Sequence, residues 1–230
     1  MARQLDFYFD CSSPWTYLAF HAVQPLAAEL GVEIAWKPIL VGGVFNAVNQ
    51  TVYDGRAKPN PLKQAYMLKD LGDWGRLYGL RIVFPPKVFP VNSVKCMRGA
   101  FAALDEGKLV PYAAAAFEAY WSDDRDLARE EVLADIAQRA GLDRQRFFAG
   151  IETDSCKARL RANTDELIAR GGFGSPTMFV GQFDVLRQRP PAAGARGVAG
   201  SRCALRKCCH PERSEGPLVG VAKGPSLRSG

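Results

Sequence analysis

The order of apolar and polar residues divides the chain into a sheet segment, a long helical stretch and a return to strand. Residues 5–9 alternate and are rich in aromatics, which predicts a β-strand. Residues 14–30 carry apolar side chains at helical spacing, Gly31 ends the pattern, and residues 32–38 alternate again. A strand, a helix and a strand in succession predict a βαβ unit with two parallel strands.

Helical periods dominate the middle of the chain. The aromatic stripe of Tyr66, Trp74 and Tyr78 is expected to face a core. A proline-rich connector occupies residues 84–92, and a β-type run at residues 177–180 ends the pattern. Helices are expected over residues 60–78, 93–106, 109–121, 130–140 and 154–170, with a short one near Phe147. This order favours an α/β fold in which a large helical insertion interrupts a thioredoxin-like sheet.

The basic charge of the chain is concentrated at one end. Residues 187–230 hold nine Lys/Arg and two Asp/Glu, whereas residues 1–186 hold 21 and 22. Because the rest of the chain is close to neutral, we expect no nucleic-acid partner. Residues 1–6 do not resemble a secretory signal, and no apolar run approaches the roughly 18 residues of a membrane span. We therefore expect a cytoplasmic protein with no membrane partner.

The six cysteines do not predict a redox or metal centre. None of them forms a C-x-x-C pair, and with only two histidines no zinc spacing is convincing. We expect reduced, independent thiols and no metal. Cys11, at the end of the first predicted strand, is expected to be a buried small apolar residue.

Ser13-Pro14 marks the junction of the first strand and the first helix. The positive end of the helix dipole and free backbone N–H groups at such a junction stabilise an anion. His21 lies two turns into the helix, so Ser13 has no adjacent base to make it an attacking alkoxide. The residues alone leave open whether this anion belongs to Ser13 itself or to a thiolate that a cofactor brings.

Three motifs, in this order and spacing, resemble the 2-hydroxychromene-2-carboxylate isomerase family, relatives of kappa-class glutathione transferases and of the disulfide oxidoreductase DsbA. The resemblance covers about residues 4–185 and implies a DsbA-like fold and a glutathione-dependent isomerase of aromatic-compound catabolism. The motifs are Asp6-Phe7-Tyr8-Phe9-Asp10 leading to Ser13-Pro14-x-x-Tyr17-Leu18; residues 66–71 with Trp74 and Tyr78-Gly79-Leu80; and residues 172–181, Gly-Phe-Gly-Ser-Pro-Thr-Met-Phe-Val-Gly.

The resemblance also implies roles for particular residues. The family's nucleophile-position serine falls on Ser13, which would bind the glutathione thiolate. Thr16 occupies the second position of the redox relatives' C-x-x-C motif, so disulfide exchange is not available there. Pro176 fits the family's cis-proline loop, and Ser175 would offer its backbone N–H and C=O to glutathione lying alongside as an extra strand. Family members often have a branched apolar residue in place of Ser175.

Recognition of a small aromatic substrate is expected to involve three asparagines. Asn46 stands where the family often places a lysine that contacts the substrate carboxylate, so that charge is absent here. Asn60 and Asn92 match polar positions that line the substrate pocket in relatives, although turn or N-cap roles explain both residues equally well. Because relatives are often dimers, the resemblance also implies a homodimer.

The segment from residue 186 onward departs from the family. Relatives continue with a further strand, a turn that holds the γ-glutamyl end of glutathione, and a final helix. A legal choice of codons for residues 186–197, read one base later, gives Phe-Gly-Asn-Asp-Arg-Leu-Pro-Leu-Val-Arg-Glu, which restores that turn. We therefore hypothesise that residues 186–230 are out of frame and disordered, which would disrupt the C-terminal strand and helix and weaken glutathione binding.

Four segments and three functions follow from these patterns. The leading function is a glutathione-dependent cis–trans isomerase of 2-hydroxychromene-2-carboxylate or a related aromatic-degradation intermediate. The alternatives are a kappa-type glutathione transferase or peroxidase and a non-catalytic thioredoxin-like binding protein. The segments are a thioredoxin-like βαβ unit (1–40), a helical insertion (41–170), the return of the thioredoxin-like domain with the cis-proline loop (171–185) and the out-of-frame tail (186–230).

Overall fold

A computed structural model gives the structure of the protein and describes residues 3–181 and 183–184. Within these residues one sheet has the strand order β2-β1-β3-β4. β1 pairs in parallel with β2 and antiparallel with β3, and β4 pairs antiparallel with β3. The predicted parallel unit and the predicted return strand are therefore confirmed. The strands are β1 (Arg3–Phe9), β2 (Val32–Pro38), β3 (Thr177–Val180) and β4 (Phe183–Asp184).

Helix α1 (Pro14–Leu30) has the predicted limits because both ends carry strong signals. Ser13 caps its N-terminus, and Pro14 at the first helical position has no N–H to leave unpaired. Gly31 ends the helix in the left-handed conformation with φ of 60°, which suits glycine.

The helical block contains two helices that the sequence pattern did not predict, α2 (Val41–Val48) and α3 (Thr51–Ala57). Glycines at positions 42, 43 and 55 weaken the local helix signal in both. The others are α4 (Pro61–Leu77), α5 (Val94–Asp105), α6 (Leu109–Phe117), the π-helix η1 (Glu118–Ser122), α7 (Glu130–Arg139), α8 (Arg144–Ile151) and α9 (Asp154–Ala169).

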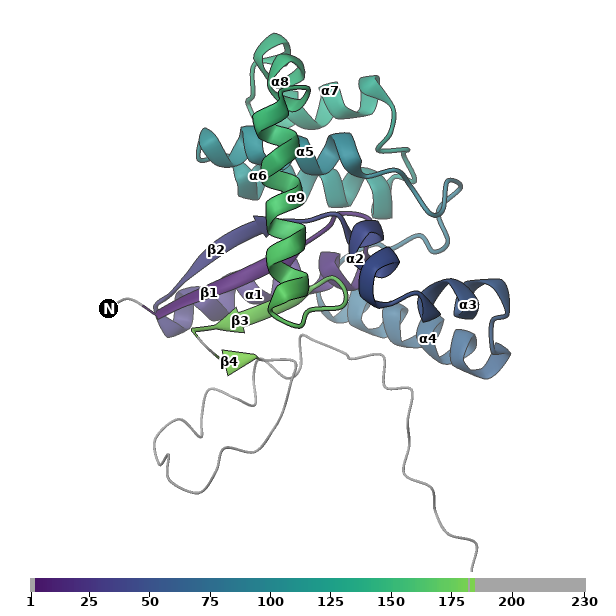
Figure 1. The fold of residues 1–230 in the computed structure, drawn as a ribbon. Helices are drawn as coiled ribbons and strands as arrows, with labels where there is room; N and C mark the ends of the chain where they lie inside the picture. The colour runs from purple at the N-terminus through teal and green to yellow at the C-terminus, as the bar shows by residue number, and fades with distance from the viewer. Residues whose placement is uncertain (1–2, 182, 185–230) are drawn as a thin grey trace, which may run out of the picture.

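The two faces of the sheet carry different helices. Figure 1 shows α9 crossing in front of β1 and β3, with α1 behind them. On the α1 face, the rings of Phe7, Phe20 and Trp36 pack into the larger core with side chains of α5 and α6. On the α9 face, Tyr8 and Phe179 form a smaller core. This arrangement is the DsbA-like thioredoxin fold, with the helical block connecting β2 to β3.

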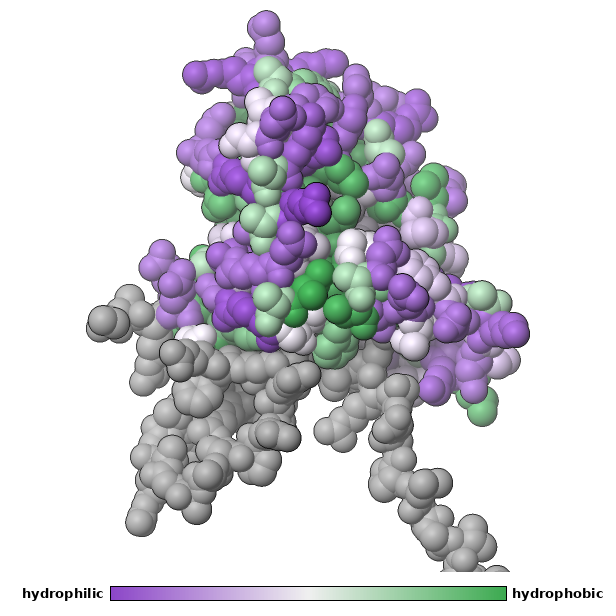
Figure 2. All heavy atoms as spheres, in the orientation of Figure 1, coloured by the Kyte–Doolittle hydropathy of each residue, from purple (hydrophilic) through white to green (hydrophobic). Residues whose placement is uncertain are grey.

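Helices α3 and α4 form an arm beside the sheet, at the right of Figure 1. Tyr66 in α4 is 60% exposed, so its predicted core position is wrong. Trp74 and Tyr78 are only partly buried and stack on each other. On the face drawn in Figure 2, hydrophilic side chains predominate over the outer helices and the arm, and apolar side chains gather beside the lower half of α9.

Several sequence predictions fall outside what this fold tests. The proposed frame shift and the Cys208-Cys209-His210 cluster lie outside the described residues, and the four segment limits stay predictions. None of the helices in residues 3–184 is long and apolar enough to cross a membrane. In the same part of the chain, no three His, Cys, Asp or Glu side chains gather closely enough to hold a metal ion.

Candidate active site

Ser13 and Ser175 meet at the N-terminus of α1, although 162 residues separate them. The Ser13 hydroxyl donates a hydrogen bond to the Ser175 carbonyl oxygen at 3.0 Å. The same hydroxyl oxygen accepts the Thr16 N–H at 3.3 Å, as an N-cap does. The Ser175–Pro176 peptide bond is cis, as predicted. The structure thus brings together the three residues expected to bind glutathione.

The side chain of Ser175 explains the departure from a branched apolar residue. Its hydroxyl oxygen accepts the Asp10 N–H at 2.9 Å and lies 2.8 Å from the Thr16 hydroxyl. An apolar side chain would leave the Asp10 N–H without this acceptor, which is costly for a buried donor. Thr16, which stands at the second position of the redox relatives' C-x-x-C motif, therefore takes part in a polar contact between the turn and the cis-proline loop.

The free N–H groups expected at the start of α1 are reduced in number. Pro14 has no N–H, the Thr16 N–H is paired with the Ser13 hydroxyl, and the Ser13 N–H donates to the Asp10 carbonyl at 3.2 Å. The Ser13 hydroxyl and the dipole of α1 would contribute to the stabilisation of an anion here.

Asp10 is a buried residue of the site that the sequence reasoning missed. One carboxylate oxygen accepts the Ser12 N–H at 2.9 Å, and the other accepts the Val41 N–H at 2.9 Å and the Ser93 hydroxyl at 3.1 Å. Burial raises the pKa of the Asp10 carboxyl, and these hydrogen bonds oppose the shift. Asp10 therefore joins the serine turn, the start of α2 and the segment before α5. An acidic residue directly after an apolar strand was the available signal.

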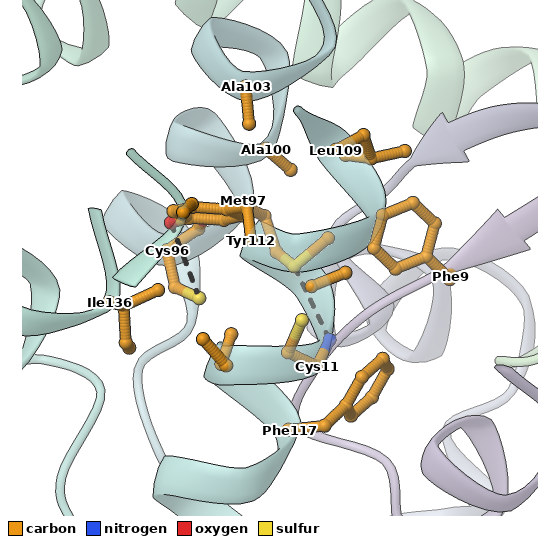
Figure 3. Close-up of a cluster of buried hydrophobic side chains, with 14 of the residues drawn as sticks. Phe9, Cys11, Cys96, Met97, Ala100, Ala103, Leu109, Tyr112, Phe117 and Ile136 are labelled. Carbon is orange, nitrogen blue, oxygen red and sulfur yellow. Dashed lines mark hydrogen bonds between the residues drawn. The ribbon is translucent and has the colours of Figure 1, made fainter. Parts of the chain in front are cut away.

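Cys11 belongs to the larger core, and Figure 3 shows it beside Met97 in that cluster. Its N–H donates to the sulfur of Met97 at 3.3 Å, and its carbonyl accepts the Trp121 indole N–H at 2.9 Å. Burial raises the pKa of the Cys11 thiol well above its usual value. The predicted structural role is confirmed, because a buried, protonated thiol is a poor nucleophile. Like Cys11, Cys96 and Cys156 are free thiols.

The predicted substrate-binding asparagines lie outside this contact network. Asn60 caps α4 by accepting the Leu62 and Lys63 N–H groups, and Asn92 accepts the Val94 N–H at 3.1 Å. Asn46 accepts the Tyr53 hydroxyl at 2.7 Å and is exposed. The residue after Asn92 is Ser93, whose hydroxyl contacts Asp10. Along the chain, Asn92 is therefore nearer to the site than Asn60 is. A substrate-binding role for these three residues stays a prediction.

Comparison with known proteins assigns the family. A family model of the DSBA-like thioredoxin domain matches residues 4–196. The chain belongs to this family. The match extends past residue 185, where the resemblance drawn from the three motifs ends.

Named relatives indicate which enzymes of this family the chain is similar to. The 2-hydroxychromene-2-carboxylate isomerase of Pseudomonas sp. (strain C18) is 32% identical over 77% of this chain and 81% of its own. A solved 2-hydroxychromene-2-carboxylate isomerase has a TM-score of 0.65 and 29% identity, covering 78% of this chain and 86% of its own. Glutathione S-transferase kappa 1 of Rattus norvegicus is 24% identical over 76% of this chain and 81% of its own. Within the DsbA-like family, this chain is an enzyme of the isomerase type.

Proposed function

We propose that the protein is a glutathione-dependent cis–trans isomerase of 2-hydroxychromene-2-carboxylate or of a related aromatic-degradation intermediate. The observation that carries this proposal is the hydrogen bond from the Ser13 hydroxyl to the Ser175 carbonyl. It joins the serine at the helix end to the loop expected to bind a peptide. The named activities of the relatives support the choice of isomerisation and of glutathione.

The residues present fit a glutathione peptide. Residue pairing between β1 and β3 begins at Tyr8 and Thr177, so Ser175 lies just beyond the ladder. Its backbone is therefore available to an added strand in the manner of β-augmentation. Because the Ser13 hydroxyl touches the Ser175 carbonyl, a cysteine bound at Ser175 would have Ser13 as a neighbour.

Ser13 would act by donating a hydrogen bond to the sulfur. When bound, glutathione would supply a thiolate that adds to the conjugated substrate and later leaves, allowing rotation about a single bond. The Ser13 hydroxyl now donates to the Ser175 carbonyl, and a peptide N–H at that carbonyl would free the hydroxyl to turn toward the sulfur. The positive end of α1 would add to the stabilisation of negative charge.

A kappa-type glutathione transferase or peroxidase is the second candidate, favoured by the likeness to the rat kappa enzyme. It would use the same serine and cis-proline loop with an electrophile or a peroxide as the second substrate. The two candidates therefore differ in substrate and share the way in which glutathione is bound.

One pair of assays separates these functions. Isomerisation of 2-hydroxychromene-2-carboxylate is measured with and without glutathione, beside conjugation of glutathione to a chloronitrobenzene. We expect isomerisation that requires glutathione. Conjugation without isomerisation would replace the proposal by the transferase function, and activity independent of glutathione would refute both.

A further inference from the structure

Arg56 in α3 lies over three aromatic rings. Its guanidinium carbon is 5.7 Å from the centroid of the Phe45 ring, 6.0 Å from that of Tyr53 and 5.4 Å from that of Phe89. These rings come from α2, from α3 and from the connector before α5. A guanidinium held by ring faces keeps a fixed orientation, while the N–H groups at its edge can still bind a carboxylate.

The Phe45 ring connects Arg56 to the cis-proline loop. A Cβ atom added to Gly174, the residue before Ser175, would lie 3.9 Å from a ring carbon of Phe45. Directly after the end of α2, the side-chain amide of Asn49 donates to the Phe173 carbonyl at 3.1 Å. Helix α2 therefore packs against the loop that carries Ser175, with the guanidinium on the Phe45 ring.

The Phe89 ring links Arg56 to the serine turn through two further rings. Phe89 packs edge-on against Phe84, with ring centroids 5.3 Å apart, and Phe84 stacks on Trp121. The Trp121 indole N–H donates to the Cys11 carbonyl, two residues before Ser13. Arg56 thus lies where α2 and the connector, both of which border the candidate active site, approach each other.

The positive charge of Arg56 has no carboxylate partner in the described part of the chain. None of the ion pairs there includes Arg56, and its side chain is exposed. The neutral Asn46 belongs to the same cluster, since its side-chain oxygen accepts the hydroxyl of Tyr53. An oriented guanidinium with several N–H donors suits a planar anion better than the Asn46 amide does.

We propose that Arg56 is the residue that binds the carboxylate of the aromatic substrate. Its guanidinium edge would hold the carboxylate, and the neighbouring rings of Phe45 and Phe89 would border the aromatic part of the same molecule. This inference rests on the proposed function, because it assumes a substrate that is an aromatic acid.

The test compares Arg56→Gln with Arg56→Lys and with Lys58→Gln as a matched control. Lys58 is an exposed cation at the end of the same helix and has none of the three ring contacts. In the isomerase assay, Arg56→Gln should raise KM for the aromatic acid by roughly 10- to 100-fold, the value of a charge-assisted hydrogen-bonded pair. KM for glutathione and the melting temperature should stay at wild-type values, Arg56→Lys should recover part of the loss, and Lys58→Gln should have no effect.

A binding measurement keeps this inference separate from the proposed function. Salicylate and salicylamide, which differ at the carboxylate, are titrated into the wild-type protein and into Arg56→Gln by calorimetry. Wild-type protein should prefer salicylate, and the preference should disappear in the variant. If that happens in a protein without isomerase activity, the proposed function fails and the assignment of Arg56 stands.

Three results would overturn the assignment of Arg56. They are an unchanged KM for the aromatic acid in an active Arg56→Gln enzyme, a rise in KM for glutathione alone, and the absence of any preference for salicylate in the wild type. A loss of activity that follows a lowered melting temperature, with KM unchanged, would assign Arg56 a structural role.

Discussion

Asp10 and Cys11 are neighbours in sequence, and both are completely buried, yet they belong to different environments. The Asp10 carboxylate accepts hydrogen bonds from two backbone N–H groups and a hydroxyl at the edge of the candidate active site. Cys11 lies among sulfur-containing, aromatic and alanine side chains of the larger core. Burial alone therefore does not identify a chemical site, whereas the partners of the buried group do.

Removal of the Asp10 carboxylate should have the largest effect on stability. Asp10→Ala leaves the Ser12 and Val41 N–H groups and the Ser93 hydroxyl without an acceptor, at a cost of about 3–5 kcal/mol in the free energy of unfolding. Urea unfolding followed by circular dichroism measures this loss. A loss below about 1 kcal/mol would show that Asp10 does not join the three segments.

Asp10→Asn serves as the control for charge. Burial raises the pKa of Asp10 in the folded protein, so the folded state binds its proton more tightly than the unfolded state does. The resulting stabilisation is present below the unfolded-state pKa of about 3.9 and is lost as pH rises through the folded-state pKa. The stability of the wild type relative to Asp10→Asn should therefore fall as pH rises above about 4.

Substitution of Ser175 by a branched apolar residue should have the next largest effect on stability. Ser175→Val removes the acceptor of the Asp10 N–H and the contact with the Thr16 hydroxyl, and we expect a loss of about 1–3 kcal/mol in stability. The backbone that would bind glutathione is kept. Ser175→Thr, which retains the hydroxyl, is the matched control, and equal stability of the two variants would contradict the role given to this hydroxyl.

On the Cys11 side, substitution should change stability and leave chemistry intact. Cys11→Ala should cost about 1–2 kcal/mol through a small cavity, without altering turnover or KM for glutathione. Cys96→Ala, in the same cluster, provides the comparison. A selective loss of turnover in Cys11→Ala would show that the Cys11 thiol, and not the polar site around Ser13, carries the chemistry.

The sequence predicted those features that depend on local signals. The ends of α1 followed from Ser13, Pro14 and Gly31, and the cis-proline loop from its motif. The contacts of Asp10 and the three-ring site of Arg56 could not be predicted, because their partners come from segments far apart in the chain. α2 was missed because its first N–H group, that of Val41, is capped by the Asp10 carboxylate. This partner is distant in the chain, so no local residue signals the helix start.

The central claim is that the Ser13 hydroxyl stabilises a thiolate at the start of α1. The most direct measurement is the pKa of the glutathione thiol bound to wild-type protein and to Ser13→Ala, followed by the ultraviolet absorbance of the thiolate. We predict a lowered thiol pKa in the wild type, a smaller shift in Ser13→Ala and a turnover reduced by about 100-fold or more, as for loss of one preorganised donor. An unchanged thiol pKa with wild-type turnover in Ser13→Ala would contradict the account.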